Sequence, residues 1–200
     1  EKLHGQTRYA FLPAAVVAGC VKAVESFPGL HLALQLKDEL HAFNCPLADF
    51  AYPLWGIDPQ LSIPLNPNVF NQTVKILIYF ENLVDSVTDL PSSLVNLCQT
   101  ICMDQANVYL TDQGKVLQIT NNQTNKFKSI DHLRRQLNLK PEEIVVFGDD
   151  WNDLEMLTGF PNGVVMGNAD RELRCQILYQ TQSNDKDGIA YALHTLLGLI

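Results

Sequence analysis

The sequence predicts an α/β protein whose two parts differ in how strands and helices follow one another. Before about residue 120, predicted strands come mostly in adjacent pairs joined by tight turns, which is an α+β pattern. After residue 120, strands and helices alternate, which indicates a parallel sheet with helices on its faces. With 200 residues, 46% of them hydrophobic, the chain can bury one sizeable core or two small ones.

The first part opens with a predicted helix from about Pro13 to Ser26, because proline suits a first helical turn. Phe27-Pro28-Gly29 ends it, and His31 to Lys37 with Glu39 to Asn44 form a predicted hairpin. Cys45 to Asn71 contains five prolines and little periodicity. This segment is therefore predicted to be a loop with short helical pieces.

The rest of the first part supplies a buried strand, a helix and a second hairpin. The apolar run Val74 to Phe80 is typical of a buried strand, and Leu90 to Cys102 has helical apolar spacing. The strands Asn107 to Leu110 and Lys115 to Thr120 flank a turn that ends in Gly114, a residue suited to a positive φ. These elements predict a mixed sheet with few helices.

The second part alternates short apolar strands with helices. Its predicted helices are Ser129 to Leu139, Asn152 to Leu157, Ala169 to Cys175 and Gly188 to Leu197. Its predicted strands are Glu143 to Phe147, Gly163 to Met166 and Ile177 to Tyr179. In such parallel sheets, ligands bind at the carboxyl ends of the strands.

Composition narrows the class of partner. A net charge of −8 and a pI near 5.0 leave no basic stripe for a nucleic-acid backbone, so a small-molecule ligand fits better. Five scattered cysteines without a C-x-x-C pair predict no disulfide framework, and Cys98 and Cys102 are expected to be small buried apolar residues. No stretch approaches the ~18 consecutive apolar residues of a membrane span. We therefore expect a cytoplasmic protein without a nucleic-acid or membrane partner.

The polar cluster Gly148-Asp149-Asp150-Trp151-Asn152-Asp153 stands where a predicted strand ends and a helix begins. Three carboxylates and an amide at that place offer the hard oxygen ligands that Mg²⁺ prefers. Helix capping would explain one of the aspartates, but not the whole cluster. A calcium-binding EF-hand loop is excluded because its alternating ligands and central glycine are absent.

Four segments in order resemble the Cof-type phosphatases of the haloacid dehalogenase superfamily. Phe147 to Leu157, F-G-D-D-W-N-D-L-E-M-L, resembles the family's fourth motif, and Lys126 with the helix that follows resembles the third. Val165 to Ala169 and Thr181 to Ala190 are similar to the last two core segments. The resemblance implies that residues 121–200 are the C-terminal half of a Rossmann-like core. Residues 1–120, after a short lead-in, match only in pattern and would form the inserted α+β cap domain.

The resemblance also implies roles for individual residues. Asp149 would bind Mg²⁺, and Asp153 would be either a second ligand or a carboxylate behind the ligands. Lys126 would neutralise the phosphate and the nucleophile together, and Asn152 would contact the phosphate end of the substrate. Lys128 is a nearby competitor for the role of Lys126.

Two asparagines and three aromatic residues have less specific expected roles. Asn168 and Asn184 are expected to shape loops or cap helices. Phe43, Tyr52 and Trp55 could line a substrate site or pack in a core.

One departure from the family pattern limits the predicted activity. The family's nucleophile is the first aspartate of a D-x-D motif that closes the first core strand. The only D-x-D string here, Asp185-Lys186-Asp187, follows no such strand. We therefore expect the 200 residues to lack the nucleophile segment and to be inactive alone, with possible self-association or pairing with that segment.

Two functions of different classes remain open. The first is a magnesium-dependent phosphomonoester hydrolase that acts through an aspartyl-phosphate, with sugar phosphates as the leading substrates by analogy. The second is a non-catalytic binding or regulatory remnant of such a phosphatase. A D-x-D-x-T segment encoded immediately upstream would distinguish the first from the second.

Overall fold

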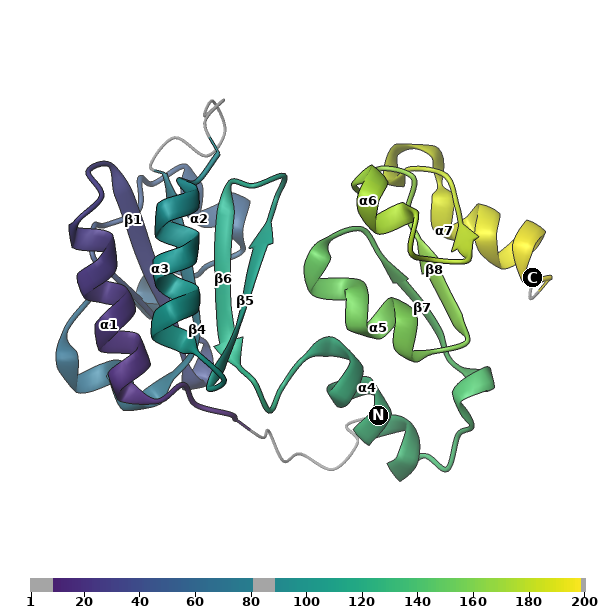
Figure 1. Ribbon diagram of the computed structural model, residues 1–200, viewed down its shortest axis with the longest axis horizontal. Helices are drawn as coiled ribbons and strands as arrows, with labels where there is room; N and C mark the ends of the chain where they lie inside the picture. The colour runs from purple at the N-terminus through teal and green to yellow at the C-terminus, as the bar shows by residue number, and fades with distance from the viewer. Residues whose placement is uncertain (1–8, 81–88, 199–200) are drawn as a thin grey trace. The chain divides into compact units, whose positions relative to one another are not determined.

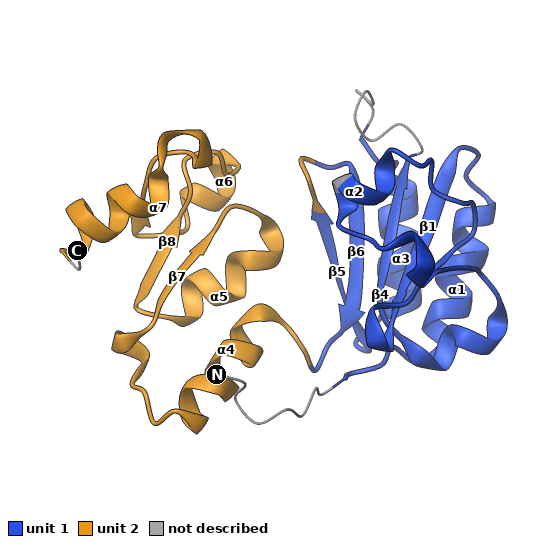
Figure 2. Cartoon of the chain, turned by 180° about the vertical axis from the view of Figure 1, so that it is seen from behind, with its two compact units in different colours: residues 1–110, 114–123 blue, residues 111–113, 124–200 orange. Residues whose placement is uncertain are grey.

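A computed structural model describes residues 9–80 and 89–198, and it divides into two compact units. Unit 1 comprises residues 1–110 and 114–123, and unit 2 comprises residues 111–113 and 124–200 (Figure 2). Each unit has its own sheet and its own buried apolar cluster. The two units are therefore described separately.

Unit 1 is built on a six-stranded mixed sheet with the order β3-β2-β1-β4-β6-β5. Its strands are β1 Leu30–Leu36, β2 His41–Phe43, β3 Ser62–Pro64, β4 Thr73–Phe80, β5 Ala106–Thr111 and β6 Val116–Asn121. Strand β1 pairs antiparallel with β2 and with β4, and β4 pairs antiparallel with β6. Strands β5 and β6 are also neighbours in the sheet, so both predicted hairpins form.

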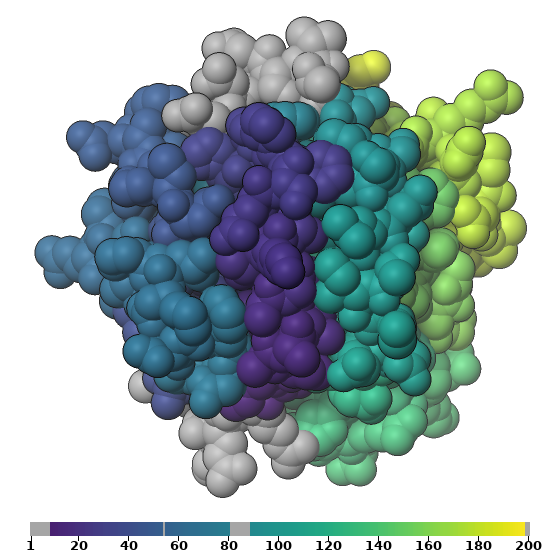
Figure 3. All heavy atoms as spheres, turned by 60° about the vertical axis from the view of Figure 1, so that its left-hand side comes forward, coloured from purple at the N-terminus to yellow at the C-terminus, as the bar shows by residue number. Residues whose placement is uncertain are grey.

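Helices α1, Ala14–Glu25, and α3, Ser92–Cys102, lie over one face of this sheet (Figure 1). They run side by side in the space-filling view (Figure 3). The larger core of unit 1 lies beneath them, and alternate strand residues such as Leu32, Leu34, Ile76 and Ile78 are fully buried in it. Side chains that alternate along a strand in this way point to the same face of the sheet.

The opposite face of the sheet is packed by the segment between β2 and β4. Helix α2, Ala51–Trp55, brings Trp55 against Tyr79, with 4.6 Å between the ring centroids. Phe43 and Tyr52 join the same apolar cluster. In the structure these three aromatic side chains make packing contacts within the core.

The predicted loop Cys45 to Asn71 needs one correction, because it contains strand β3. This strand pairs in parallel with β2, from His41 opposite Ser62 to Phe43 opposite Pro64. It has only three residues and ends in proline, so no alternation marks it in the sequence. The short helical pieces predicted there are α2 and the 3₁₀ turns Pro59–Leu61 and Pro67–Gln72.

Unit 2 has a three-stranded parallel sheet in the order β7-β8-β9. The strands are β7 Val145–Gly148, β8 Asn162–Val165 and β9 Tyr179–Gln180. The helices are α4 Lys126–Gln136, α5 Leu154–Gly159, α6 Arg171–Arg174 and α7 Gly188–Tyr191, which continues as a π-helical turn over Ala192–Leu196. The predicted alternation is therefore present, although the bounds of most of its elements differ from the predicted ones by one to three residues.

One apolar cluster joins α4, α5 and α6 to a face of this sheet. It includes Val146, Leu157, Phe160, Val165 and Leu173, all buried. Because the three strands are parallel, their carboxyl ends lie at the same edge of the sheet. The loops that follow β7, β8 and β9 therefore meet there.

No helix among the described residues has the length and apolar character needed to cross a membrane.

Candidate functional site

The loop after β7 contains three aspartates with different partners. Asp150 accepts a hydrogen bond from the backbone N–H of Trp151 at 2.7 Å and caps the 3₁₀ turn Trp151–Asp153. Burial raises the pKa of Asp150 above its usual value, and the hydrogen bonds that it accepts from the backbone N–H groups of Asp112 and Trp151 oppose this rise. Capping thus accounts for Asp150 and for one contact of Asp153, which accepts the Asp150 N–H and completes a capping box, but not for Asp149.

Asp153 is almost completely buried, and both of its carboxylate oxygens are engaged. Oδ2 accepts from the backbone N–H groups of Asp149 at 3.1 Å and Asp150 at 3.4 Å. Oδ1 accepts from the Lys126 ammonium at 2.5 Å. Gly148 provides the room, since a Cβ there would lie 2.5 Å from the Cβ of Asp153. Glycine is needed at this position for a close approach of side chain to backbone.

Lys126 reaches the loop from the first turn of α4. The helix begins at Lys126 rather than at the predicted Ser129, because the Asn125 side chain accepts the Lys128 N–H at 2.7 Å and caps it. The Lys126 ammonium also donates to Asn152 Oδ1 at 3.3 Å. The structure therefore brings together Lys126, Asn152 and Asp153, three residues singled out from the sequence.

Asp149, the fourth predicted residue, is held by a neighbouring loop. Asn168, which follows β8, donates from Nδ2 to Asp149 Oδ2 at 2.8 Å. Its Oδ1 accepts the backbone N–H of Asn184, beyond β9, at 3.0 Å. Asn168 does link loops, as expected, but its bond to Asp149 was not predicted. The sequence feature that could have indicated this bond is the position of Asn168 directly after β8, the strand that pairs with β7.

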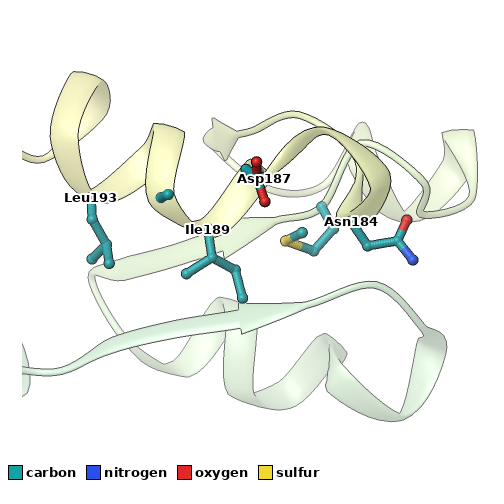
Figure 4. A pocket seen from close by; sticks show the side chains of 7 residues that line it. Asn184, Asp187, Ile189 and Leu193 are labelled. Carbon is teal, nitrogen blue, oxygen red and sulfur yellow. The ribbon is translucent and has the colours of Figure 1, made fainter.

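A pocket of about 390 Å³ opens beside α7, next to these loops. It is lined by Met166, Asn184, Asp187, Gly188, Ile189, Ala190 and Leu193. In Figure 4, Ile189 and Leu193 point from the helix toward the strands, and Asn184 lies at the other end of the group. The lining is mainly apolar, and its polar side chains are those of Asn184 and Asp187.

The residues present suit a hard cation and a phosphate. Asp149 contributes a carboxylate oxygen, Oδ1, that makes no hydrogen bond within the described part of the chain, and oxygen ligands of this kind suit Mg²⁺. Lys126, half exposed, contributes a positive charge and three donors for phosphate oxygens. Residues 9–80 and 89–198 contain no group of three His, Cys, Asp or Glu side chains arranged to hold a metal ion.

The chain belongs to the family of haloacid dehalogenase-like hydrolases, whose model matches residues 64–193. The family predicted from the four motifs is thereby confirmed. YxeH of Bacillus subtilis, provisionally named as a phosphatase, is 29% identical over 174 residues, covering 83% of this chain and 63% of YxeH. A chloroplast endoribonuclease of Arabidopsis thaliana, YBEY, is 34% identical over 157 residues, covering 78% of this chain and 26% of that protein.

Solved structures agree with the fold. The sugar phosphatase BT4131 superposes with a TM-score of 0.76 at 18% identity, covering 96% of this chain and 69% of that one. TM0651 of Thermotoga maritima gives a TM-score of 0.65 at 22% identity, covering 96% and 70%. The predicted α/β class is confirmed. The chain spans less than two thirds of the length of YxeH.

Proposed function

We propose that the chain is part of a magnesium-dependent phosphomonoester hydrolase that acts on a small phosphate ester. The observation that carries the proposal is the position of the Lys126 ammonium. It extends from α4 and donates hydrogen bonds to Asp153 and Asn152, which belong to the loop that also contains Asp149. Phosphoryl transfer depends chiefly on positioning and on neutralising negative charge. A cationic donor, an amide and a carboxylate on connected loops provide these functions.

Each side chain receives a distinct role. Asp149 binds the cation through a carboxylate oxygen, and Lys126 with Asn152 binds the phosphate. Of the two roles open to Asp153, we favour support of Lys126, because both Asp153 oxygens already accept hydrogen bonds. Bound Mg²⁺ would supply positive charge to the phosphate oxygens. The carboxylate of Asp153 meanwhile keeps the Lys126 ammonium directed into the site.

The nucleophile of the proposed reaction would come from outside these 200 residues. An aspartyl-phosphate needs an aspartate at the end of a core strand, and the sequence has no D-x-D motif in that position. We therefore propose that the 200 residues alone do not hydrolyse phosphate esters, and that they pair with a nucleophile-bearing segment or with one another. Residues 1–120 would be the α+β cap, and residues 121–200 the C-terminal half of the core.

Sugar phosphates remain the leading substrate class. The structural neighbour BT4131 is a sugar phosphatase, and this supports the class by analogy only. A cytoplasmic location and the absence of nucleic-acid or membrane partners remain proposals that rest on the acidic composition.

The test uses the protein that carries a D-x-D segment upstream of these residues, with p-nitrophenyl phosphate as a generic ester. Lys126→Ala and Asp149→Ala should each lower kcat about 10²–10³-fold, the loss typical of removing a group that stabilises developing charge. Lys128→Ala is the matched control, because it removes an ammonium two residues away, and it should leave kcat almost unchanged. Full activity after Asp149→Ala would refute the site. Phosphate-ester binding without turnover in the intact protein would favour the binding or regulatory remnant.

A further inference from the structure

Asn168 joins the three loops that follow the strands of unit 2. It lies beyond the end of β8, and its side chain reaches the β7 loop at Asp149 and the segment after β9 at Asn184. Both polar ends of its amide are used, the nitrogen as a donor and the oxygen as an acceptor. A single side chain therefore links all three loops, in addition to the backbone hydrogen bonds from Met166 to Gly148 and from Gly167 to Gln182.

This contact leaves the Asp149 carboxylate with two unequal oxygens. The amide of Asn168 holds Oδ2 at 2.8 Å and so fixes the rotation of the carboxylate. The backbone of Asp149 is fixed as well, because its N–H donates to the buried Asp153 at 3.1 Å. Asp149 therefore presents one oxygen, Oδ1, in a set direction.

We propose that Asn168 is a positioning residue that restricts Asp149 to one-oxygen ligation and so makes the site prefer Mg²⁺ over Ca²⁺. The proposal rests on the proposed function, in which Asp149 binds the cation. Mg²⁺ is small, needs near-octahedral geometry and keeps several waters, so it suits single carboxylate oxygens. Ca²⁺ is larger, takes more oxygen ligands and readily accepts both oxygens of one carboxylate. Residues that hydrogen-bond to ligands tune the metal in this way.

The two ends of the Asn168 contact can be tested separately. Asn168→Ala removes both, whereas Asn184→Pro removes only the N–H that Asn168 Oδ1 accepts. Asn184 is the first residue of the 3₁₀ turn Asn184–Lys186, and Ser183 before it is extended with ψ 163°. Proline is tolerated at such a position. Asn184→Pro is thus a control for general loosening of the loops.

Asn168→Asp is a second variant that protects against misfolding. It preserves the shape of the side chain and the acceptor for the Asn184 N–H, but it places a carboxylate oxygen where the Nδ2 donor faced Asp149. The hold on Asp149 Oδ2 is lost without a cavity. Both Asn168 variants should therefore release Asp149 to bind a cation through two oxygens.

The experiment measures dissociation constants of Mg²⁺ and Ca²⁺ by displacement of Mn²⁺, followed by water-proton relaxation, in the full protein. Asn168→Ala should weaken Mg²⁺ binding about 10–100-fold, the range found when such a supporting hydrogen bond is removed. Ca²⁺ binding should fall much less, so the preference for Mg²⁺ drops in Asn168→Ala and in Asn168→Asp. Asn184→Pro should leave the preference unchanged.

Three outcomes would count against the proposal or its basis. An unchanged Mg²⁺ to Ca²⁺ preference in both Asn168 variants overturns the role of Asn168. An equal loss of both ions in the Asn168 variants and in Asn184→Pro also overturns it, because this would indicate only general loosening. Unchanged Mg²⁺ binding in Asp149→Ala would instead refute the metal site of the proposed function.

Discussion

Replacing Gly148 with alanine should destabilise unit 2 through one identifiable clash. A Cβ at this position would lie 2.5 Å, 2.7 Å and 2.8 Å from the Cβ, Cγ and Oδ2 of Asp153. Carbon atoms in favourable contact are about 3.5–4.0 Å apart, so Asp153 or the strand end must move. Overpacking of this kind costs about 1–3 kcal/mol. A charge-assisted hydrogen bond of about 1.5–3 kcal/mol is also at risk if Asp153 leaves Lys126.

The clash can be separated from the intrinsic effect of alanine by a double-mutant cycle. Asp153→Gly removes all three atoms that the new Cβ would meet. The backbone of Gly148 is outside the left-handed region, so alanine in open space there should be neutral or stabilise by about 0.4–1 kcal/mol. Gly148→Ala should therefore destabilise the native protein and cease to do so in the Asp153→Gly background.

The assay is urea unfolding monitored by the fluorescence of Trp151. The chain has two tryptophans, Trp55 in unit 1 and Trp151 in unit 2, so Trp55→Phe isolates the signal of unit 2. If the free-energy cost of Gly148→Ala is the same in both backgrounds within about 0.5 kcal/mol, the two sites are independent and the steric argument is wrong.

Two further predictions concern pH and association. Burial lowers the pKa of His41, and the nearby Lys75 charge acts in the same direction. The unfolded chain therefore binds a proton more readily, and the stability of unit 1 should fall as the pH drops below about 6.5. His41→Gln should flatten this dependence in urea titrations at several pH values, and an unchanged slope would contradict it. Strand β7 lies at an edge of the described sheet and Ile189 is 48% exposed, so the 200-residue chain should self-associate in light scattering. Ile189→Lys should reduce this association, and a monomer at high concentration without the substitution would refute it.

Most elements could be predicted from the sequence because their apolar patterns were long enough to distinguish a strand from a helix. The buried run of β4 and the helical spacing of α3 are found within two residues of the expected bounds. Strand β3 could not be predicted, since its pairing with β2 depends on a contact across the chain rather than on local alternation. Helix α4 begins at Lys126 and not at the predicted Ser129, because the side chain of Asn125 caps it.

Within the candidate site, the sequence indicated which residues lie together, but not which of their atoms form hydrogen bonds with one another. The cluster after β7 and the lysine before the helix were visible as residue types at a strand end. The bond from Asn168 to Asp149 depends on β8 lying beside β7 and on the reach of one amide. Such a contact has no local pattern. Local spacing likewise could not reveal that Asp153 uses both of its oxygens within the protein.

Three carboxylates within five residues would repel one another, and the loop avoids this by giving each a different partner. Asp150 accepts the backbone N–H groups of Trp151 and Asp112, and Asp153 accepts hydrogen bonds from the Lys126 ammonium and two backbone N–H groups. These partners differ in what they require of the acid. Asparagine caps as well as aspartate, so Asp150→Asn can keep the Trp151 contact and should lose only the neutral hydrogen bond from the Asp112 N–H, about 0.5–1.5 kcal/mol.

Asp153→Asn should behave differently, because one side of its amide would present an N–H group either to the ammonium or to the backbone donors. The expected loss is about 1–3 kcal/mol, lower than for a fully buried ion pair because Lys126 is 49% exposed and can return to water. Urea unfolding monitored by Trp151 compares the two substitutions directly. Each removes one negative charge from the same loop, so a general relief of repulsion would stabilise both. Equal losses in the free energy of unfolding for Asp150→Asn and Asp153→Asn would mean that the two aspartates do not have the different structural roles that their hydrogen bonds indicate.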